Sequence, residues 1–132
     1  MNVLVDTSVW SLGLRRRGAV HPCVAELRAL IDDGRVVMAG AVRQELLSGI
    51  RQTADFVRLR DHLRAFPDEP AASADHERAA EMFNACRGKG VQASNTDFLL
   101  CALAERCGFA IFTTDQDFSR IAQVVPVRLH RA

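Results

Sequence analysis

The sequence lacks the features that mark several large classes of protein. It contains no run of roughly 18 apolar residues, the length that a membrane-spanning helix requires. It has no basic start followed by an apolar run and a small-residue cleavage site, so we expect no secretory signal and a cytoplasmic protein. Because no repeat, low-complexity tract or linker divides the chain, we predict a single domain over residues 1–132.

Cysteine is scarce, and its spacing does not indicate a metal site. The four cysteines form no C-x-x-C pair, which is the spacing typical of structural zinc sites. Cys23, Cys86 and Cys101 fall within apolar helical patterns. We therefore predict small, reduced core residues rather than zinc ligands.

A strong charge of either sign is also missing. The chain has 17 Lys and Arg against 16 Asp and Glu, a formal net charge of +1. This balance indicates neither a strongly basic nucleic-acid-binding protein nor an acidic tail. Lys89 is the only lysine, and the other basic residues are arginines. Arginine suits bidentate phosphate contacts, but genome composition explains the same bias, so composition does not decide between the two.

Short apolar runs alternate with helical patterns along the chain. The apolar runs predict strands at 3–5, 35–39, 110–112 and 124–129, the last irregular or at an edge because of Pro126. The helical patterns predict helices over 8–14, 22–33, 41–50, 53–66, 73–87, 98–104 and 118–122, with a loop over 66–72. Such alternation favours an α/β protein with a parallel sheet covered on both faces.

Acidic residues recur where such a fold places its chemistry. Asp6 and Asp115 follow predicted buried strands, and Asp97 opens a helix that is apolar on every side. In an open parallel sheet, the ends of the strands and the starts of the helices share one edge. We therefore expect these carboxylates to face one another there, with Glu45, which borders the apolar side of its own helix, as a fourth.

Each acid also has a simpler explanation when taken alone. Asp6 and Asp115 are suited to capping the helices that follow them. Asp97 closes the capping-box pattern Ser94-x-x-Asp97. Glu45 fits an ordinary solvated position on a helix. These explanations stay open for the single residues, but they do not account for the joint pattern.

A group of carboxylates at one edge implies a cation. Like charges held close together repel and raise one another's pKa unless a positive charge compensates them. The sequence places no lysine or histidine beside these motifs. Oxygen ligands without histidine or thiolate suit Mg²⁺ or Mn²⁺, and such a site is suited to the metal-assisted hydrolysis of a phosphodiester.

Four motifs in order carry a family resemblance. They are VLVDTS at 3–8, RQELLSG at 43–49, DFLLCALA at 97–104 and TTDQDF at 113–118. The set resembles the PIN domain and, more narrowly, the VapC toxins of bacterial type II toxin–antitoxin pairs. This resemblance implies a three-layer α/β/α fold with a short central parallel sheet. It also implies an endoribonuclease that depends on Mg²⁺ or Mn²⁺.

The resemblance also implies roles for single residues. The acidic metal-site positions of the family match Asp6, Glu45, Asp97 and Asp115. A further acid that is often present in the last motif matches Asp117. The hydroxyl positions that support the acids match Thr7 or Ser8, and Thr113.

The partners that the resemblance implies are an RNA substrate, a VapB-type antitoxin and a second copy of the chain. The antitoxin of such a pair is small, and its C-terminal segment occupies the acidic groove. Arg15, Arg16 and Arg17 belong to none of the four motifs. Contact with RNA phosphates and a solvated loop both fit this basic run.

Two other functions fit parts of the pattern. A catalytically silent PIN-like scaffold that binds RNA or protein has the same fold, but it does not need a set of four mutually repelling acids. An aspartate phosphatase uses a strand-end aspartate, here Asp6, as a covalent phosphoryl acceptor. Such enzymes typically carry a second acid two residues later, where this chain has Ser8. We therefore predict the metal-dependent nuclease.

Overall fold

A computed structural model describes residues 1–15 and 21–131. Its strands are β1 (Val3–Val5), β2 (Val36–Ala39), β3 (Asp68–Glu69) and β4 (Ala110–Phe112). Its helices are α1 (Thr7–Leu14), α2 (Pro22–Asp32), α3 (Gly40–Leu47), α4 (Thr53–Leu63), α5 (Ser73–Gly88), α6 (Asn95–Cys107) and α7 (Gln116–Ile121). The hypothesis that the arginines at 15–17 contact RNA falls mostly outside the described residues.

The strands form one parallel sheet in the order β3-β2-β1-β4. Leu4 of β1 lies opposite Val37 of β2 and Ile111 of β4. β1 is buried along its whole length, as its uninterrupted apolar run predicts for a central strand of a parallel sheet. The prediction of an α/β fold with a short central parallel sheet is confirmed.

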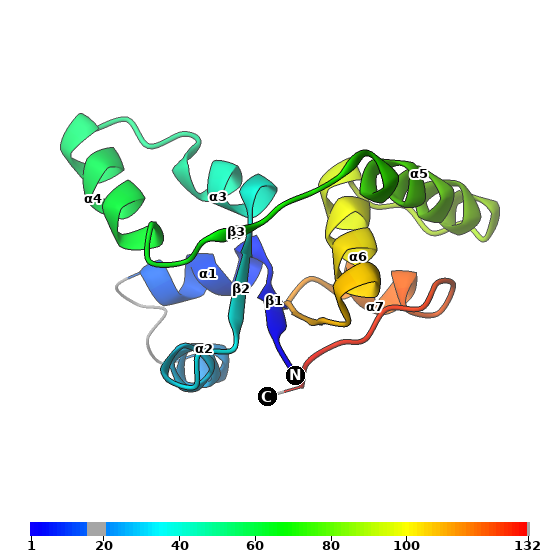
Figure 1. The fold of residues 1–132 in the computed structure, drawn as a ribbon, viewed down its shortest axis with the longest axis horizontal. Coiled ribbons are helices and arrows are strands. Elements are labelled where there is room, and N and C mark those ends of the chain that lie inside the picture. The colour runs from blue at the N-terminus through cyan, green and yellow to red at the C-terminus, as the bar shows by residue number, and fades with distance from the viewer. Residues whose placement is uncertain (16–20, 132) are drawn as a thin grey trace.

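Helices cover both faces of this sheet (Figure 1). Helices α1 to α4 lie on one side, and α5, α6 and α7 lie on the other. Trp10 and Leu30 contribute large buried side chains from the first group, and Met82 and Phe118 from the second. None of the described helices combines the length and the apolar character needed to span a bilayer. All four cysteines are free, and Cys86 is buried in the core.

Helix α6 is surrounded by other side chains, as its apolar sequence predicts. Phe98 and residues 100–104 are buried, while Leu99 is half-buried. The predicted capping box is present, because the Ser94 Oγ accepts the Asp97 N–H at 3.1 Å and the Asp97 carboxylate accepts the Ser94 N–H at 3.2 Å. The buried helix therefore places Asp97 at a defined position in its first turn.

The prediction that residues 66–72 form a plain loop is wrong. Met38 and Ala39 of β2 pair with Asp68 and Glu69, which form the short edge strand β3. Arg43 of α3 supports this segment by donating to the Asp68 Oδ1 at 2.9 Å, as well as to backbone carbonyls at the end of α4. Because this strand depends on backbone pairing and one arginine, no apolar pattern indicates it.

The prediction of a last strand over 124–129 is also wrong. Among the described residues, this segment makes only an isolated bridge between Leu129 and Ile111. The Ile111 N–H donates to the Arg128 carbonyl at 2.9 Å, and the His130 N–H donates to the Ile111 carbonyl at 2.8 Å. Pro126 lacks an N–H and has a restricted φ, so the segment before this bridge cannot extend the hydrogen-bond ladder.

Helix α5 carries a buried carboxylate that the sequence motifs do not indicate. Asp75 is 2% exposed. Its Oδ1 accepts from the Arg106 Nε at 2.7 Å, and its Oδ2 accepts from the Ala72 N–H at 2.8 Å. Arg106 also donates to the Pro70 carbonyl at 3.0 Å. These bonds join the start of α5 to the last turn of α6, away from the acids of the motifs.

Candidate active site

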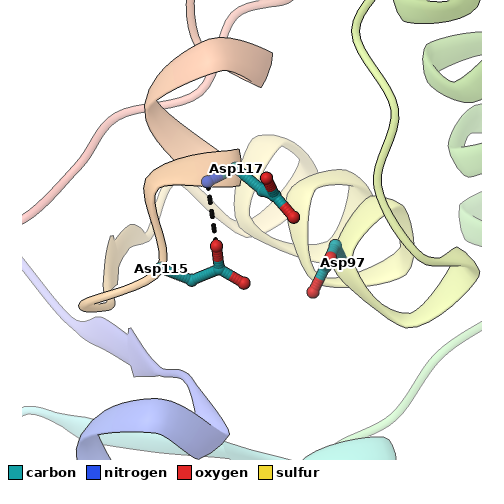
Figure 2. Close-up of side chains that lie close together, drawn as sticks. All are labelled: Asp97, Asp115 and Asp117. Carbon is teal, nitrogen blue, oxygen red and sulfur yellow. Dashed lines mark hydrogen bonds between the residues drawn. The ribbon is translucent and has the colours of Figure 1, made fainter.

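Three carboxylates come together where α6 begins and where the chain enters α7. One oxygen each of Asp97, Asp115 and Asp117 lies within 4.8 Å of the others. Figure 2 shows Asp97 on α6 facing the other two acids across the space between the helices. Asp117, which the sequence ranks below the four principal acids, belongs to this group, which we call the acid triad.

Two members of the acid triad also cap helices. Asp97 uses its Oδ2 in the capping box of α6. Asp115 is the N-cap of α7, and its Oδ1 accepts the Asp117 N–H at 2.9 Å. The capping explanations for Asp97 and Asp115 are therefore correct, but each cap engages only one carboxylate oxygen. The caps hold the two side chains in place while the second oxygen of each keeps its capacity to bind a ligand.

Asp6 lies at the end of β1 and is 6% exposed. Although it occupies the N-cap position of α1, its side chain makes no capping hydrogen bond. Its Oδ2 instead accepts from the Ser8 Oγ at 2.9 Å and from the Thr113 Oγ1 at 2.8 Å. The capping explanation for Asp6 is wrong, because two hydroxyls bind the carboxylate instead.

Backbone N–H groups orient both of these hydroxyls. The Thr114 N–H donates to the Ser8 Oγ at 3.0 Å, and the Asp115 N–H donates to the Thr113 Oγ1 at 2.9 Å. Each hydroxyl therefore accepts from the chain and directs its proton to Asp6. The turn that carries Asp115 thus also holds Asp6, which couples the two acids mechanically.

Unlike Ser8, Thr7 makes no hydrogen bond to Asp6. Its Oγ1 is buried and has no hydrogen-bond partner among the described residues. Of the two hydroxyls that the first motif offers, Ser8 is the one that contacts Asp6.

Glu45 does not belong to the acid triad, but the charges of nearby acids raise its pKa. It lies exposed on α3, which follows β2. Partial shielding of its carboxylate from water raises its pKa, and the negative charges of Asp6 and Asp97 raise it further. The Thr7 hydroxyl lies close enough to the Glu45 carboxylate to lower this pKa, although the two do not meet the geometry of an ordinary hydrogen bond. Glu45 therefore lies close enough to Asp6 and Asp97 for their charges to raise its pKa, but outside the acid triad.

The acids repel one another, as the sequence predicts. Burial raises the pKa of Asp97, its hydrogen bonds to Ser94 lower it, and the charges of Asp6 and Asp115 raise it again. One positive charge near the acid triad was not predicted from the sequence. Arg120 forms an ion pair with Asp117 at 3.0 Å. Their i,i+3 spacing on a short helix is the signal for this pair. With 60% of its side chain exposed, Arg120 compensates the acids only weakly.

Comparison with known proteins identifies the family. The sequence model of the PIN domain matches residues 3–124. The chain belongs to the PIN-domain family. The VapC ribonuclease Mb1587 of Mycobacterium bovis and ribonuclease VapC11 of Mycobacterium tuberculosis are each 32% identical to it over 127 residues, covering 92% of both chains. This similarity places the chain in the VapC group of the PIN domains.

Solved structures show the same fold at low sequence identity. FitAcB from Neisseria gonorrhoeae has a TM-score of 0.76 at 20% identity and covers 98% of this chain and 96% of that one. VapBC2 from Rickettsia felis, bound to a DNA fragment from their promoter, has a TM-score of 0.79 at 14% identity and covers 98% of each chain. At these identities the likeness establishes the PIN fold.

The donor set of this PIN domain fits a hard divalent cation. The acid triad and the neighbouring Asp6 offer only carboxylate oxygens as donors. Oxygen donors are the ligands that Mg²⁺ and Mn²⁺ prefer, whereas zinc sites draw on histidine and cysteine. The residues present therefore fit Mg²⁺ or Mn²⁺.

The hydroxyl of Thr113 offers a direct test of how this PIN domain holds Asp6. Thr113→Val removes the bond to Asp6 and the acceptor for the Asp115 N–H. We expect Mn²⁺ affinity, measured by calorimetry, to fall roughly tenfold to a hundredfold, because groups that orient metal ligands have effects of this size.

Thr114→Val is the matched control for that variant. The Thr114 side chain is exposed, and only its backbone N–H enters the network. We expect its Mn²⁺ affinity to equal that of the wild type. Equal affinity in the Thr113→Val variant would show that the hydroxyl does not position Asp6.

Proposed function

We propose that this chain is a metal-dependent endoribonuclease that hydrolyses RNA phosphodiester bonds, acting as the toxin of a VapBC-type toxin–antitoxin pair. The observation that carries this proposal is the acid triad, with the hydroxyl-held Asp6 beside it. The kinship with proteins named VapC ribonucleases supports RNA as the substrate. A scaffold that only binds RNA has no need for this concentration of negative charge. We further propose that residues 1–132 act as one PIN-like domain.

The proposed metal ligands are the free oxygens of the acid triad together with Asp6 and Glu45. A bound Mg²⁺ or Mn²⁺ supplies charge neutralisation at the phosphate and lowers the pKa of a coordinated water. The caps at Asp97 and Asp115 and the hydroxyls on Asp6 orient these carboxylates before substrate arrives.

Metal dependence of RNA cleavage tests the proposal. Purified protein is incubated with single-stranded RNA in Mg²⁺ or Mn²⁺, in EDTA, and in EDTA followed by excess metal. We expect cleavage with metal, a loss of roughly a hundredfold or more in EDTA, and recovery on adding metal back. Binding of RNA without cleavage in any metal would support the scaffold instead, and cleavage that resists EDTA would contradict the metal mechanism.

We propose two protein partners, a VapB-type antitoxin and a second copy of the chain. The solved relatives VapBC2 and FitAB, the latter bound to an IR36 DNA fragment, support a two-component assembly. A cluster of carboxylates attracts an arginine side chain, so an antitoxin segment that carries one fits the charge of the acid triad. We place the toxin in the cytoplasm, where its RNA substrate is. A short neighbouring reading frame that encodes a DNA-binding fold with a C-terminal arm would identify the antitoxin.

A further inference from the structure

Helices α5 and α6 form a cavity of about 440 Å³ that opens beside the first turn of α6. We call it the α5–α6 cavity. Phe83, Phe98 and Leu99 contribute its apolar part, and the exposed Asn84 and Asn95 contribute side-chain amides. The rings of Phe83 and Phe98 meet edge to face, with centroids 5.5 Å apart. Phe98 is 1% exposed and packs behind the Phe83 ring, so the half-buried Phe83 and Leu99 form the apolar surface that a ligand can reach, with hydrogen-bonding groups at its edge.

This cavity lies close to the acid triad along the chain but on another side of α6. Asn95 and Leu99 line the cavity, and each stands two residues from Asp97. At about 100° per residue, both point away from Asp97, across a helix that is about 10–12 Å wide. An RNA strand whose phosphate lies at the acid triad and which crosses the start of α6 brings the base of a flanking nucleotide to this cavity.

The lining of the α5–α6 cavity favours an uncharged ligand. Among the described residues that line it, none is Asp, Glu, Lys or Arg, and His76 is the titratable one. A phosphate group requires positive charge or several N–H donors, and a basic antitoxin side chain requires an acid. A nucleobase is flat and neutral, it stacks on aromatic side chains, and its edges pair with amide donors and acceptors.

We propose that the α5–α6 cavity binds a nucleobase of the RNA substrate that flanks the scissile phosphate, and that it thereby contributes to the sequence preference of cleavage. This inference rests on the proposed ribonuclease function, because it assumes that RNA lies across the acid triad. It assigns a base-reading role to Asn84 and Asn95, which belong to none of the four sequence motifs.

Ala80→Leu tests the inference by placing a larger side chain in the cavity. Ala80 lines the cavity and is exposed on α5, so the substitution leaves the core intact. Ala85→Leu is the matched control, because Ala85 is also exposed on α5 and is absent from the cavity lining. Asn84→Ala serves as a second variant that removes an amide without adding bulk.

Two readouts separate base recognition from cleavage. Binding of labelled A-, C- and U-homopolymeric RNA is measured by fluorescence anisotropy in EDTA. The ends produced from random single-stranded RNA in Mg²⁺ are sequenced. We expect the wild type and Ala85→Leu to prefer one base in binding and at one position flanking the cut. We expect Ala80→Leu to reduce that preference roughly tenfold, the size of a base–aromatic stacking interaction, and Asn84→Ala to change which base is preferred.

Three results would overturn the inference. The wild type could show no base preference in either readout, or the Ala80→Leu variant could keep the wild-type preference. In the third, Ala80→Leu turns a dimeric protein into a monomer but keeps the base preference. The last result would assign the cavity to a second copy of the chain. Base-selective binding that Ala80→Leu abolishes, in a wild type that never cleaves, would support the cavity and reject the ribonuclease. Metal-dependent cleavage by Ala80→Leu with the wild-type base preference would support the ribonuclease and reject base binding in the cavity.

Discussion

Asp97→Asn is expected to lower the rate of RNA cleavage roughly a thousandfold and to leave a folded protein. The asparagine side chain keeps an oxygen that can accept the Ser94 N–H, so the capping box of α6 survives the substitution. The variant loses the negative charge that Asp97 brings to the acid triad, and an NH2 group, which cannot bind a cation, replaces its second oxygen. A loss of several kcal/mol of transition-state stabilisation corresponds to this change in rate. Cleavage in Mg²⁺, Mn²⁺ binding by calorimetry and the thermal midpoint are the measurements.

Two further variants make this test specific. Asp6→Asn is expected to lower the rate of cleavage to a similar extent, because Asp6 is the acid that the hydroxyls of Ser8 and Thr113 hold. Asp55→Asn is the control, since Asp55 is exposed on α4 and pairs only with Arg58 among the described residues. We expect wild-type cleavage from this control. Full activity of either purified site variant would refute the assignment of the metal site.

Asp75→Asn is expected to lower the free energy of unfolding by about 1–2 kcal/mol, because the carboxylate is buried but the side chain of its partner Arg106 is 45% exposed. Asp75 is 2% exposed and accepts hydrogen bonds from Arg106 and from the backbone of Ala72. The amide cannot accept from both with equal strength, and the guanidinium loses its charge partner. We expect the thermal midpoint to fall by roughly 5 °C.

Asp61→Asn is the control for this stability measurement. Asp61 also pairs with arginines, but its side chain is 54% exposed on α4. Exposed pairs contribute little, so we expect a change of less than about 1 kcal/mol. An equally small effect of Asp75→Asn would show that the link between α5 and α6 does not stabilise the fold.

The same carboxylate is expected to make stability depend on acid pH. The hydrogen bond from Arg106 holds the pKa of Asp75 below its ordinary value, while burial acts in the opposite direction. In the unfolded chain the group titrates near pH 4. The unfolded state therefore takes up a proton first as the pH falls, and acid favours unfolding. The advantage of the wild type over Asp75→Asn in urea unfolding should be full near neutral pH and shrink below about pH 4; an advantage that grows in acid would contradict this.

The sequence by itself determined the main layout of the protein. The apolar run at 3–5 requires burial on both faces, which a central parallel strand satisfies, and DFLLCALA requires a helix buried on nearly every side. Parallel strands bring their ends to one edge, so Asp97 and Asp115 were predictable neighbours. The capping box at Ser94 was predictable as well, because it depends on residues only three positions apart.

Only the tertiary structure decided which acids meet closely and what holds them. Asp117 joins the acid triad and Glu45 does not, because the turn into α7 and the position of α3 set those distances. Asp6 is held by a hydroxyl from Thr113, which is far away in the sequence, rather than by the local cap that its own helix offers. Strand β3 and the α5–α6 cavity likewise arise from segments that meet only in the fold. Local sequence patterns predict which residues are buried and which cap a helix. Distances between remote segments depend on how the elements pack, and the periodicity of a single sequence does not predict that packing.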